Sequence, residues 1–423
     1  MTAHFSLFDQ FATSNSAYKA YYSTETLLTK ISSDILTNME NQKTTLMVML
    51  DLSAAFDTVK IKTLIDIFEF KYNIKGLSLQ WIISYLTKRH QKVTVNGMVS
   101  EAMSLKHGVP QGSCMGPLAF LAYLSPLQDI IDLHSPTVEA YADDTQLYIS
   151  FDSSDTYSVQ NAIDCMERCI ADVREYMLKH QLKINDDKTV VLTIGSRQQL
   201  SKLPEISVRV GNSIIKPSNQ ATNLGVIFDS NMSLSQQISN VRKKSFYQLT
   251  KIKQLKKYLD SKTTELLTHA FVSSNIDYCN SLYYNLPKKQ IKRLQSIQNS
   301  AARVITNTRK YDRISPVLKD LHWLPIQQRI VFKIALMTFK CRHNLSPEYL
   351  QSSINERQQT RTLRSNSRQP LLIQRVTTNM GGRSFLHAAP TVWNNLPVSL
   401  TQITNINTFK KQLKTYLFEK VYN

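Results

Sequence analysis

The sequence predicts an α+β fold in which an antiparallel sheet with helices precedes a helical, basic region and a small C-terminal element. Two observations lead to this prediction. Short apolar runs alternate with amphipathic helical patterns as far as Phe228, and from Leu234 onward the patterns are helical. The charge changes with the pattern: residues 1–200 have 17 Lys and Arg against 22 Asp and Glu, whereas residues 201–423 have 34 against 10.

The formal net charge of +19 therefore comes from the C-terminal half of the chain. A sustained basic region indicates a polyanionic partner, and nucleic acid is the leading candidate. An anionic membrane surface is a lesser candidate, and simple solvation of helix faces is the third possibility. We expect no membrane span and no secretory leader, because the sequence lacks a long apolar run and a charged-then-apolar start. Five scattered cysteines suit a reducing compartment.

The first predicted strand ends at an acidic residue. Before it, the apolar spacing over residues 23–41 predicts a helix capped by Ser23 or Thr24. The apolar run 46–50 predicts a strand buried on both faces, and it leads directly into Asp51. Phe56 follows, at the start of a second helix. Asp51 therefore either builds one wall of a site or caps this helix.

A loop rich in glycine and proline occupies residues 108–117, after a predicted helix at 77–86 and a strand at 92–97. Its composition excludes regular structure and lets a backbone approach a ligand closely. Gln111 offers a donor and an acceptor there, beside Gly112. A predicted helix over about 118–132 would point its first N–H groups at the loop, which favours a phosphate. A plain connecting turn is the alternative.

Two adjacent carboxylates, Asp143 and Asp144, lie between runs that fit two short strands, so we expect them at the turn of a hairpin. Like charges at close range raise each other's pKa unless a cation neutralises them. Mg²⁺ is the natural candidate, because it prefers carboxylate oxygens and keeps substrate phosphates in its shell. The alternative is a solvated turn without function.

The next elements continue the alternation. Apolar residues recur at helical spacing over 159–177 and predict one long amphipathic helix. Lys188 lies just before a strand predicted at 190–194, which could pair beside the acidic hairpin. Lys188 is therefore a candidate phosphate-binding or proton-donating group. Runs at 206–210 and 224–228 predict two further strands.

Helices with apolar stripes and basic backs follow Leu234, an arrangement suited to a phosphate backbone. Residues 347–374 indicate a linker or arm, and a last element covers 385–418 with Trp393 and Leu396 buried. The candidate nucleic-acid-binding residues are Lys243, Lys244, Lys288, Lys289, Lys292 and Arg293.

Taken together, the segment 51–57 (DLSAAFD), the loop 108–117 and the segment 141–147 (YADDTQL) resemble, in order and spacing, the palm motifs of reverse transcriptases. The likeness is greatest to LINE-type, non-long-terminal-repeat retrotransposon polymerases of the Jockey superfamily. It extends to residues 16–25, 182–189, 223–229, 277–286 and 393–397. The resemblance implies a right-hand polymerase palm, a helical basic thumb and RNA-directed DNA polymerase activity.

The resemblance also implies a catalytic arrangement. Asp51 and Asp143 would bridge two Mg²⁺ ions roughly 3.5–4 Å apart, with Asp144 as a supporting third acid. Phe56 would lie under the sugar of the incoming nucleotide and exclude a 2′-hydroxyl.

Gln111 and Gly112 match residues that contact the template and the incoming nucleotide. The implied partners are an RNA template, a DNA primer or target, and deoxynucleoside triphosphates. The implied location is intracellular, in the nucleus or a cytoplasmic ribonucleoprotein.

The predicted domains are a remnant of the fingers with one helix (1–45), the palm (46–232), the thumb (233–345) and a basic linker with a C-terminal element (346–423). Because the family carries fingers and endonuclease regions before the segment at Ser16, we expect an N-terminally truncated polymerase. The main alternative is a catalytically silent, nucleic-acid-binding remnant. An RNA-templated RNA polymerase is disfavoured by Phe56, and a maturase by the family-like C-terminal half.

Overall fold

A computed structural model describes residues 14–53, 56–357 and 370–422. The chain forms two compact units. Unit 1 consists of Thr44–Asn219 and the segment that ends at Ala20, and unit 2 consists of Tyr21–Lys43 and Gln220–Asn423. Across the described residues, no helix combines the length and apolar character needed to cross a bilayer.

Unit 1 is built on a four-stranded antiparallel sheet with the order β10-β1-β8-β7. The strands are β1 (Thr44–Leu50), β7 (Thr137–Tyr141), β8 (Asp144–Phe151) and β10 (Val190–Ile194). β1 lies between β8 and β10, which explains its almost wholly buried run of apolar and threonine residues. The strand predicted beside the acidic hairpin, β10, instead pairs with β1, and this pairing decides where Lys188 lies.

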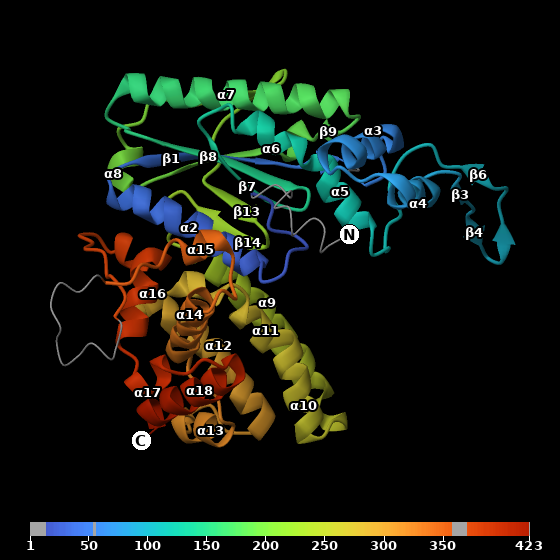
Figure 1. The fold of residues 1–423 in the computed structure, drawn as a ribbon. Helices are drawn as coiled ribbons and strands as arrows, with labels where there is room; N and C mark the ends of the chain where they lie inside the picture. Colours follow the sequence, from blue (N-terminus) through green and yellow to red (C-terminus); the bar gives the residue numbers. More distant parts are fainter. Residues whose placement is uncertain (1–13, 54–55, 358–369, 423) are drawn as a thin grey trace. The chain divides into compact units, whose positions relative to one another are not determined.

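Helix α7 (Thr156–Lys179) packs along this sheet (Figure 1). The Asp155 side chain caps it by accepting a hydrogen bond from the Tyr157 N–H at 3.0 Å. Its buried face contains the predicted apolar stripe except the half-buried Ile163, together with Cys165 and Cys169. All five cysteines of the chain are free thiols. The α7 prediction is therefore confirmed.

The prediction of a single helix over 118–132 is wrong, because the chain forms two helices there. They are α5 (Gly116–Leu124) and α6 (Pro126–Ile131). Pro126 has no N–H to continue a helix, and the Ala122 carbonyl instead accepts hydrogen bonds from the N–H (3.2 Å) and hydroxyl (2.8 Å) of Ser125.

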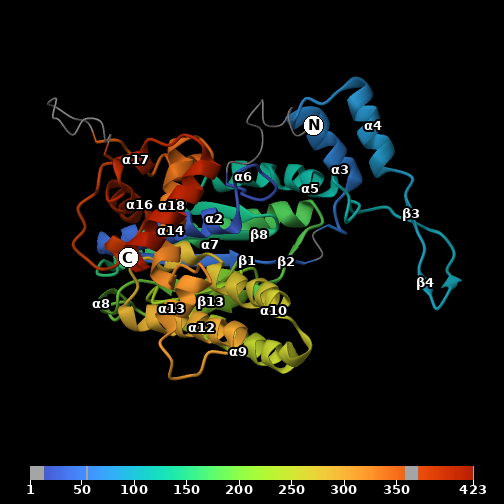
Figure 2. The ribbon, with the colours of Figure 1, turned by 90° about the horizontal axis from the view of Figure 1, so that it is seen from below.

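The strand predicted at 92–97 is also divided. Two short exposed hairpins replace it, and they lie away from the sheet of unit 1 in both views (Figures 1 and 2). Asn96 and Gly97 form the tip of the inner hairpin, both with positive φ, as predicted for a turn. The pairs are β3 (His90–Gln91) with β6 (Met103–Ser104), and β4 (Thr94–Val95) with β5 (Met98–Val99).

The remaining elements of unit 1 are short. They are β2 (Leu52–Ser53), α3 (Ile61–Asp66), η1 (Ile67–Lys71), α4 (Gly76–Leu86), β9 (Lys183–Ile184), η2 (Asp186–Lys188), α8 (Arg197–Leu200), β11 (Val208–Val210) and β12 (Ser213–Ile215). The helix predicted to start at Phe56 begins instead at Ile61, and the helix at 76–86 confirms its prediction. The run at 206–210 forms a strand that, among the described residues, pairs with β12 in a separate two-stranded sheet.

Unit 2 is mainly helical. It begins with α2 (Thr24–Glu40), whose predicted cap is confirmed: Ser23 accepts a hydrogen bond from the Thr26 N–H at 3.2 Å. The one hairpin among its described residues pairs β13 (Gln220–Asn223) with β14 (Val226–Asp229), which accounts for the run at 224–228. The helices of the central part are α9 (Ser235–Leu255), η3 (Lys256–Tyr258), α10 (Ser261–Thr268), η4 (His269–Ser273), α11 (Ser274–Asp277), η5 (Asn280–Tyr283), α12 (Lys288–Thr306) and α13 (Ile314–Asp320).

A second core in unit 2 joins α14 (Ile326–Arg342) to the C-terminal helices. Trp393 and Leu396 are buried in it, as predicted. Part of the predicted linker, 358–369, lies outside the described residues. The last elements are α15 (Glu348–Gln351), η7 (Gly381–Arg383), α16 (Phe385–Asn394), α17 (Val398–Thr401) and α18 (Ile406–Tyr422).

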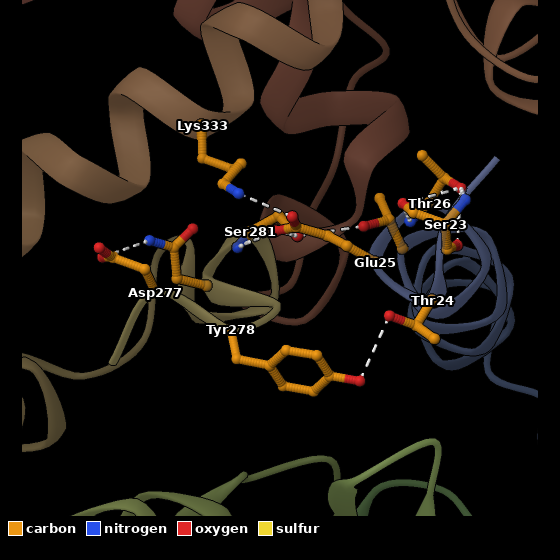
Figure 3. Close-up of polar contacts among 10 residues, drawn as sticks. Ser23, Thr24, Glu25, Thr26, Asp277, Tyr278, Ser281 and Lys333 are labelled. Carbon is orange, nitrogen blue, oxygen red and sulfur yellow. Dashed lines mark hydrogen bonds and ion pairs between the residues drawn. The ribbon is translucent and has the colours of Figure 1, made fainter. Parts of the chain in front are cut away.

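The N-terminal helix α2 is tied into unit 2 by Glu25 (Figure 3). One carboxylate oxygen of Glu25 accepts hydrogen bonds from the Ser281 N–H (3.3 Å) and hydroxyl (3.0 Å). The other pairs with the Lys333 ammonium at 2.8 Å. These charged contacts join three segments that are distant in the sequence, so α2 is an integral part of this unit.

Candidate active site

The acidic hairpin lies where the central strands of unit 1 end. Tyr141 pairs with Asp144, so the turn contains only Ala142 and Asp143, and Asp144 begins β8. The predicted hairpin is therefore confirmed. On the other side of β8, Leu50 is the last residue of β1 and pairs with Thr145. The next residues along the two strands, Asp51 and Asp144, consequently lie at the same edge of the sheet.

Asp51 follows the buried strand β1, and its side chain is only partly exposed. Its Oδ2 atom is buried and has no hydrogen-bond partner among the described residues. The Lys188 ammonium lies 3.4 Å from the same Oδ2. A buried carboxylate oxygen with so little compensation is costly unless a cation or donor completes its environment. This argues against the alternative in which Asp51 merely caps a helix.

Lys188 reaches Asp51 because of the segment that precedes β10. β9 pairs with β2, and the Asn185 N–H donates to the Asp51 carbonyl at 2.9 Å. The Arg174 guanidinium then holds the Asp186 carboxylate through two hydrogen bonds, at 2.5 and 3.1 Å. These contacts of the segment before β10 place Lys188 beside the acids. The sequence did not reveal them, since β10 itself does not neighbour the hairpin.

The three carboxylates interact electrostatically. Partial desolvation raises the pKa of Asp144, and the negative charges of Asp143 and Asp51 raise it further. Asp143 and Asp51 are thus close enough to disfavour the charged form of Asp144, as expected of groups that share a cation. The described residues nevertheless include no group of three or more acidic, His or Cys side chains already converged at metal-ligand geometry. The donor set fits a hard divalent cation in its chemistry, through carboxylate oxygens.

A first prediction concerns stability without metal. The pKa of Asp144 is raised in the folded state. Protonation of Asp144 therefore adds to the free energy of unfolding at low pH, and this stabilisation is lost as the pH rises through the folded pKa. Asp144→Asn should therefore stabilise the metal-free protein at pH 7, by less than about 1 kcal/mol because water screens an exposed side chain. Thermal melts with a chelator would measure this, and the gain should vanish below about pH 3.8, the usual pKa of aspartate. A lower melting temperature for the variant at pH 7 would contradict the prediction.

The glycine- and proline-rich loop is braced against the segment that carries Phe56. The Val109 N–H donates to the Phe56 carbonyl at 3.0 Å. Gly108 has φ +82°, and a Cβ there would meet the Asp57 and Phe56 carbonyl oxygens at 3.0 and 3.1 Å. The position therefore requires glycine, because both the backbone conformation and the close approach exclude a side chain.

The predicted substrate residues occupy this braced region. The Phe56 ring stacks on Phe120, with centroids 4.5 Å apart, and is half-buried. The Gln111 side chain is exposed, and its amide donates to the Asp57 carboxylate at 2.9 Å. Gly112 has φ +77° and open space around it. The structure thus brings Phe56 and Gln111 close together where the loop packs on the segment that carries Phe56. It brings Lys188 close to Asp51.

Asn15 is a candidate positioning residue that sequence reasoning missed. It is buried, and its side-chain amide clasps the backbone of Ala142: Nδ2 donates to the Ala142 carbonyl at 3.1 Å, and Oδ1 accepts from the Ala142 N–H at 3.2 Å. The surrounding segment lies along β7, through hydrogen bonds of Ser14 and Ser16 with Ala140. No periodicity marks Asn15, because its role depends on a partner more than a hundred residues away.

The clasp supports a strained turn. Ala142 has φ +59°, a left-handed conformation that costs a residue with a Cβ about 1–2 kcal/mol. The turn residue that follows is Asp143, so the conformation of Ala142 determines where that carboxylate points. Asn15 therefore holds the acidic turn in the geometry of the site.

A second prediction tests this clasp. Asn15→Ala leaves two buried backbone groups of Ala142 without partners, which should lower the free energy of unfolding by about 2–3 kcal/mol. Ala142→Gly removes the left-handed strain and should restore part of the loss in the double variant. Denaturant unfolding of the two single variants and the double variant measures this. Equal stability of Asn15→Ala and the parent chain would rule out the clasp.

The candidate nucleic-acid-binding residues lie on two helices of unit 2 that pack together, α9 and α12. Five of them face solvent: Lys243, Lys244, Lys288, Lys289 and Lys292. Arg293 differs, because its guanidinium donates to Gln290 Oε1 at 2.9 Å and to Ser239 Oγ at 2.8 Å. Arg293 therefore links α12 to α9 and is less available to a phosphate than its lysine neighbours.

Comparison with known protein families identifies the family of the chain. The family model for the reverse transcriptase (RNA-dependent DNA polymerase) matches residues 6–228, more than half of the chain. The chain belongs to the reverse transcriptase family. This reverse transcriptase resembles those of LINE-type, non-long-terminal-repeat elements, as the sequence motifs predicted. Its antiparallel sheet with helices is the palm of a right-hand polymerase, and the mainly helical region that follows suits the thumb.

Its curated relatives are polymerases of mobile elements. The chain is 25% identical over 317 residues to a probable RNA-directed DNA polymerase from transposon X-element of Drosophila melanogaster, covering 72% of this chain and 33% of that protein. It is 24% identical over 238 residues to the RNA-directed DNA polymerase from mobile element jockey of the same organism, covering 53% and 24%. The aligned part thus spans about a third or less of these relatives.

Solved structures of telomerase also match this reverse transcriptase. The telomerase from Candida albicans, in complex with a fragment of telomeric RNA, is 13% identical with a TM-score of 0.37, covering 78% of this chain and 54% of that one. The apo telomerase from Candida tropicalis is 11% identical with a TM-score of 0.39, covering 78% and 57%.

Proposed function

We propose that this chain is an RNA-directed DNA polymerase, which adds deoxynucleotides to a primer 3′-hydroxyl on an RNA template. The observation that carries the proposal is the placement of Asp51 beside Asp143 and Asp144 where the central strands end, with charges that act on one another. Membership of the reverse transcriptase family and the mobile-element relatives support the same reaction.

Asp51 and Asp143 would hold two Mg²⁺ ions, with Asp144 supporting them. Two observations favour a cation at this cluster: Oδ2 of Asp51 accepts no hydrogen bond from the described residues, and the pKa of Asp144 is raised. When bound, such a metal pair supplies activation of the primer hydroxyl and charge neutralisation at the triphosphate. Asn15 would keep the Asp143 turn fixed while these groups act.

The other residues of unit 1 would position substrates. Phe56, held by its stack on Phe120, would exclude a 2′-hydroxyl. Gln111 and Gly112 would contact template and incoming nucleotide, since the loop is exposed and its backbone is open to close approach. Lys188, exposed and 3.4 Å from Asp51, could exchange that partner for a substrate phosphate or donate a proton to the leaving group.

The partners follow from the reaction and the charge. An RNA template, a DNA primer or target and deoxynucleoside triphosphates would be bound, the duplex through phosphates at the exposed lysines of α9 and α12. We place this activity inside the cell, in the nucleus or a cytoplasmic ribonucleoprotein, because its substrates are found there.

The test is extension of a labelled DNA primer annealed to RNA, with Mg²⁺ and the four deoxynucleotides. We expect extension that stops when a chelator is added. Binding of the same RNA to the full chain is measured in parallel. Retained RNA binding without extension, under any divalent cation, would reject the polymerase and leave a nucleic-acid-binding remnant.

A further inference from the structure

Unit 2 contains a cavity of about 510 Å³ that none of the proposed polymerase residues lines. Its lining residues begin at Glu265 and come from the helices around α10, η4, α14 and α18. The volume lies within the range of small-molecule sites in proteins. The proposed catalytic acids belong to unit 1, so this cavity calls for a separate explanation.

The walls of the cavity are rich in aromatic rings. His269 lies against Trp323 with ring centroids 5.3 Å apart, and it begins the π-helical turn η4. His322 and Phe332 also line the cavity. Trp323 is buried, whereas the side chain of His269 is 43% exposed. The two ring planes are inclined at 58°, so the exposed His269 ring offers one flat face on which a planar heterocycle can stack.

The charges inside the cavity are largely compensated. The Arg329 guanidinium pairs with Asp277 at 2.6 Å. Lys333 pairs with Glu25 at 2.8 Å (Figure 3). His269 Nε2 lies 3.5 Å from the Glu265 carboxylate, which also lines the cavity. Lys414 is exposed, and no acidic group of the described residues forms an ion pair with it. A compensated interior favours a neutral ligand group, and the uncompensated Lys414 favours an anionic group attached to it.

A polar side chain in the wall lacks a partner. Asn280 is 4% exposed, and its Oδ1 has no hydrogen-bond partner among the described residues, although its Nδ2 donates to Asp277 at 3.3 Å. Buried amide oxygens are normally satisfied. Asn280 lines the cavity, but its Oδ1 atom is itself closed to solvent, so this oxygen makes the wall more desolvated and is not an acceptor for a ligand.

We propose that this cavity binds one unpaired nucleotide of a single-stranded nucleic acid. The base stacks on His269 near Trp323, and the phosphate lies at Lys414. A base-paired nucleotide cannot enter, because both its faces and its pairing edge are occupied. The inference does not depend on polymerase activity, so binding assays test it independently.

The probes are fluorescein-labelled decamers of uridine, cytidine and adenosine ribonucleotides, and the corresponding deoxy decamers, titrated with the full chain by anisotropy. His269→Ala should weaken binding about fivefold to a hundredfold, because that is the usual effect of removing a stacking ring. The loss should persist at high salt, since stacking is not ionic. The matched control is Lys420→Gln. Lys420 lies on the same helix as Lys414, α18, but does not line the cavity, so the control removes one positive charge without changing the cavity. Lys414→Gln should weaken binding more than this control does.

Two further readouts decide the assignment. A decamer with one 4-thiouridine should crosslink to a peptide that contains His269 or Trp323, and an RNA duplex should not compete. Unchanged affinity of His269→Ala, or crosslinks confined to other peptides, would overturn the proposal. Competition by uridine monophosphate at the concentration of the decamer would assign the cavity to free nucleotides instead.

Discussion

Asp143→Asn should reduce primer extension on RNA by at least about a hundredfold to a thousandfold, because it removes one charge from the pair of acids proposed to hold both metal ions. Asp143 follows the strained Ala142 in the turn, so the isosteric amide preserves the hairpin while removing the charge. The measurement is the initial rate of single-nucleotide addition at saturating Mg²⁺. Asp144→Asn should reduce the rate less, since this residue supports the metal-bridging pair.

The matched control is Asp187→Asn. Asp187 is an exposed carboxylate on η2, one residue from Lys188, so its removal changes the charge near the site without removing an acid of the cluster. We expect nearly unchanged activity for this variant and unchanged RNA binding for all three. If Asp187→Asn and Asp143→Asn lost the same activity, the loss would come from the reduced negative charge near the site, and the assignment of Asp143 would fail.

The sequence predicted the acids because their signal is local. Asp51 follows a run of buried apolar residues, and Asp143 and Asp144 interrupt a hairpin pattern, so each position could be found from its neighbours. The register that places Asp51 next to Asp144 is not local, because it depends on which strands pair. The same reason explains why β10 was expected beside the hairpin and instead lies on the other side of β1.

Other features were missed because the sequence shows only one partner of each contact. Asn15 has no apolar pattern around it, and its function depends on the left-handed conformation of Ala142. An alanine in the sequence gives no sign of a left-handed conformation. Arg293 was grouped with the lysines by its charge, but packing of α12 on α9 directs it to Ser239. The break at Pro126 was predictable from the missing N–H alone, and the apolar periodicity concealed it.

Phe56→Ala should let an active protein accept ribonucleotides, with discrimination against them falling by about a hundredfold, the usual limit when a pocket rejects an added hydroxyl by shape. The stack on Phe120 fixes the ring of Phe56. The hydrogen bond from the Val109 N–H to the Phe56 carbonyl fixes the backbone of the same residue. The measurement compares kcat/KM for a deoxynucleotide and its ribonucleotide in single-nucleotide addition on RNA. Phe56→Tyr keeps the ring and serves as the control, with discrimination close to that of the parent chain. If Phe56→Ala remains active and still rejects ribonucleotides, the sugar is selected elsewhere, and the loop residues Gln111 and Gly112, braced against the same segment, become the next candidates.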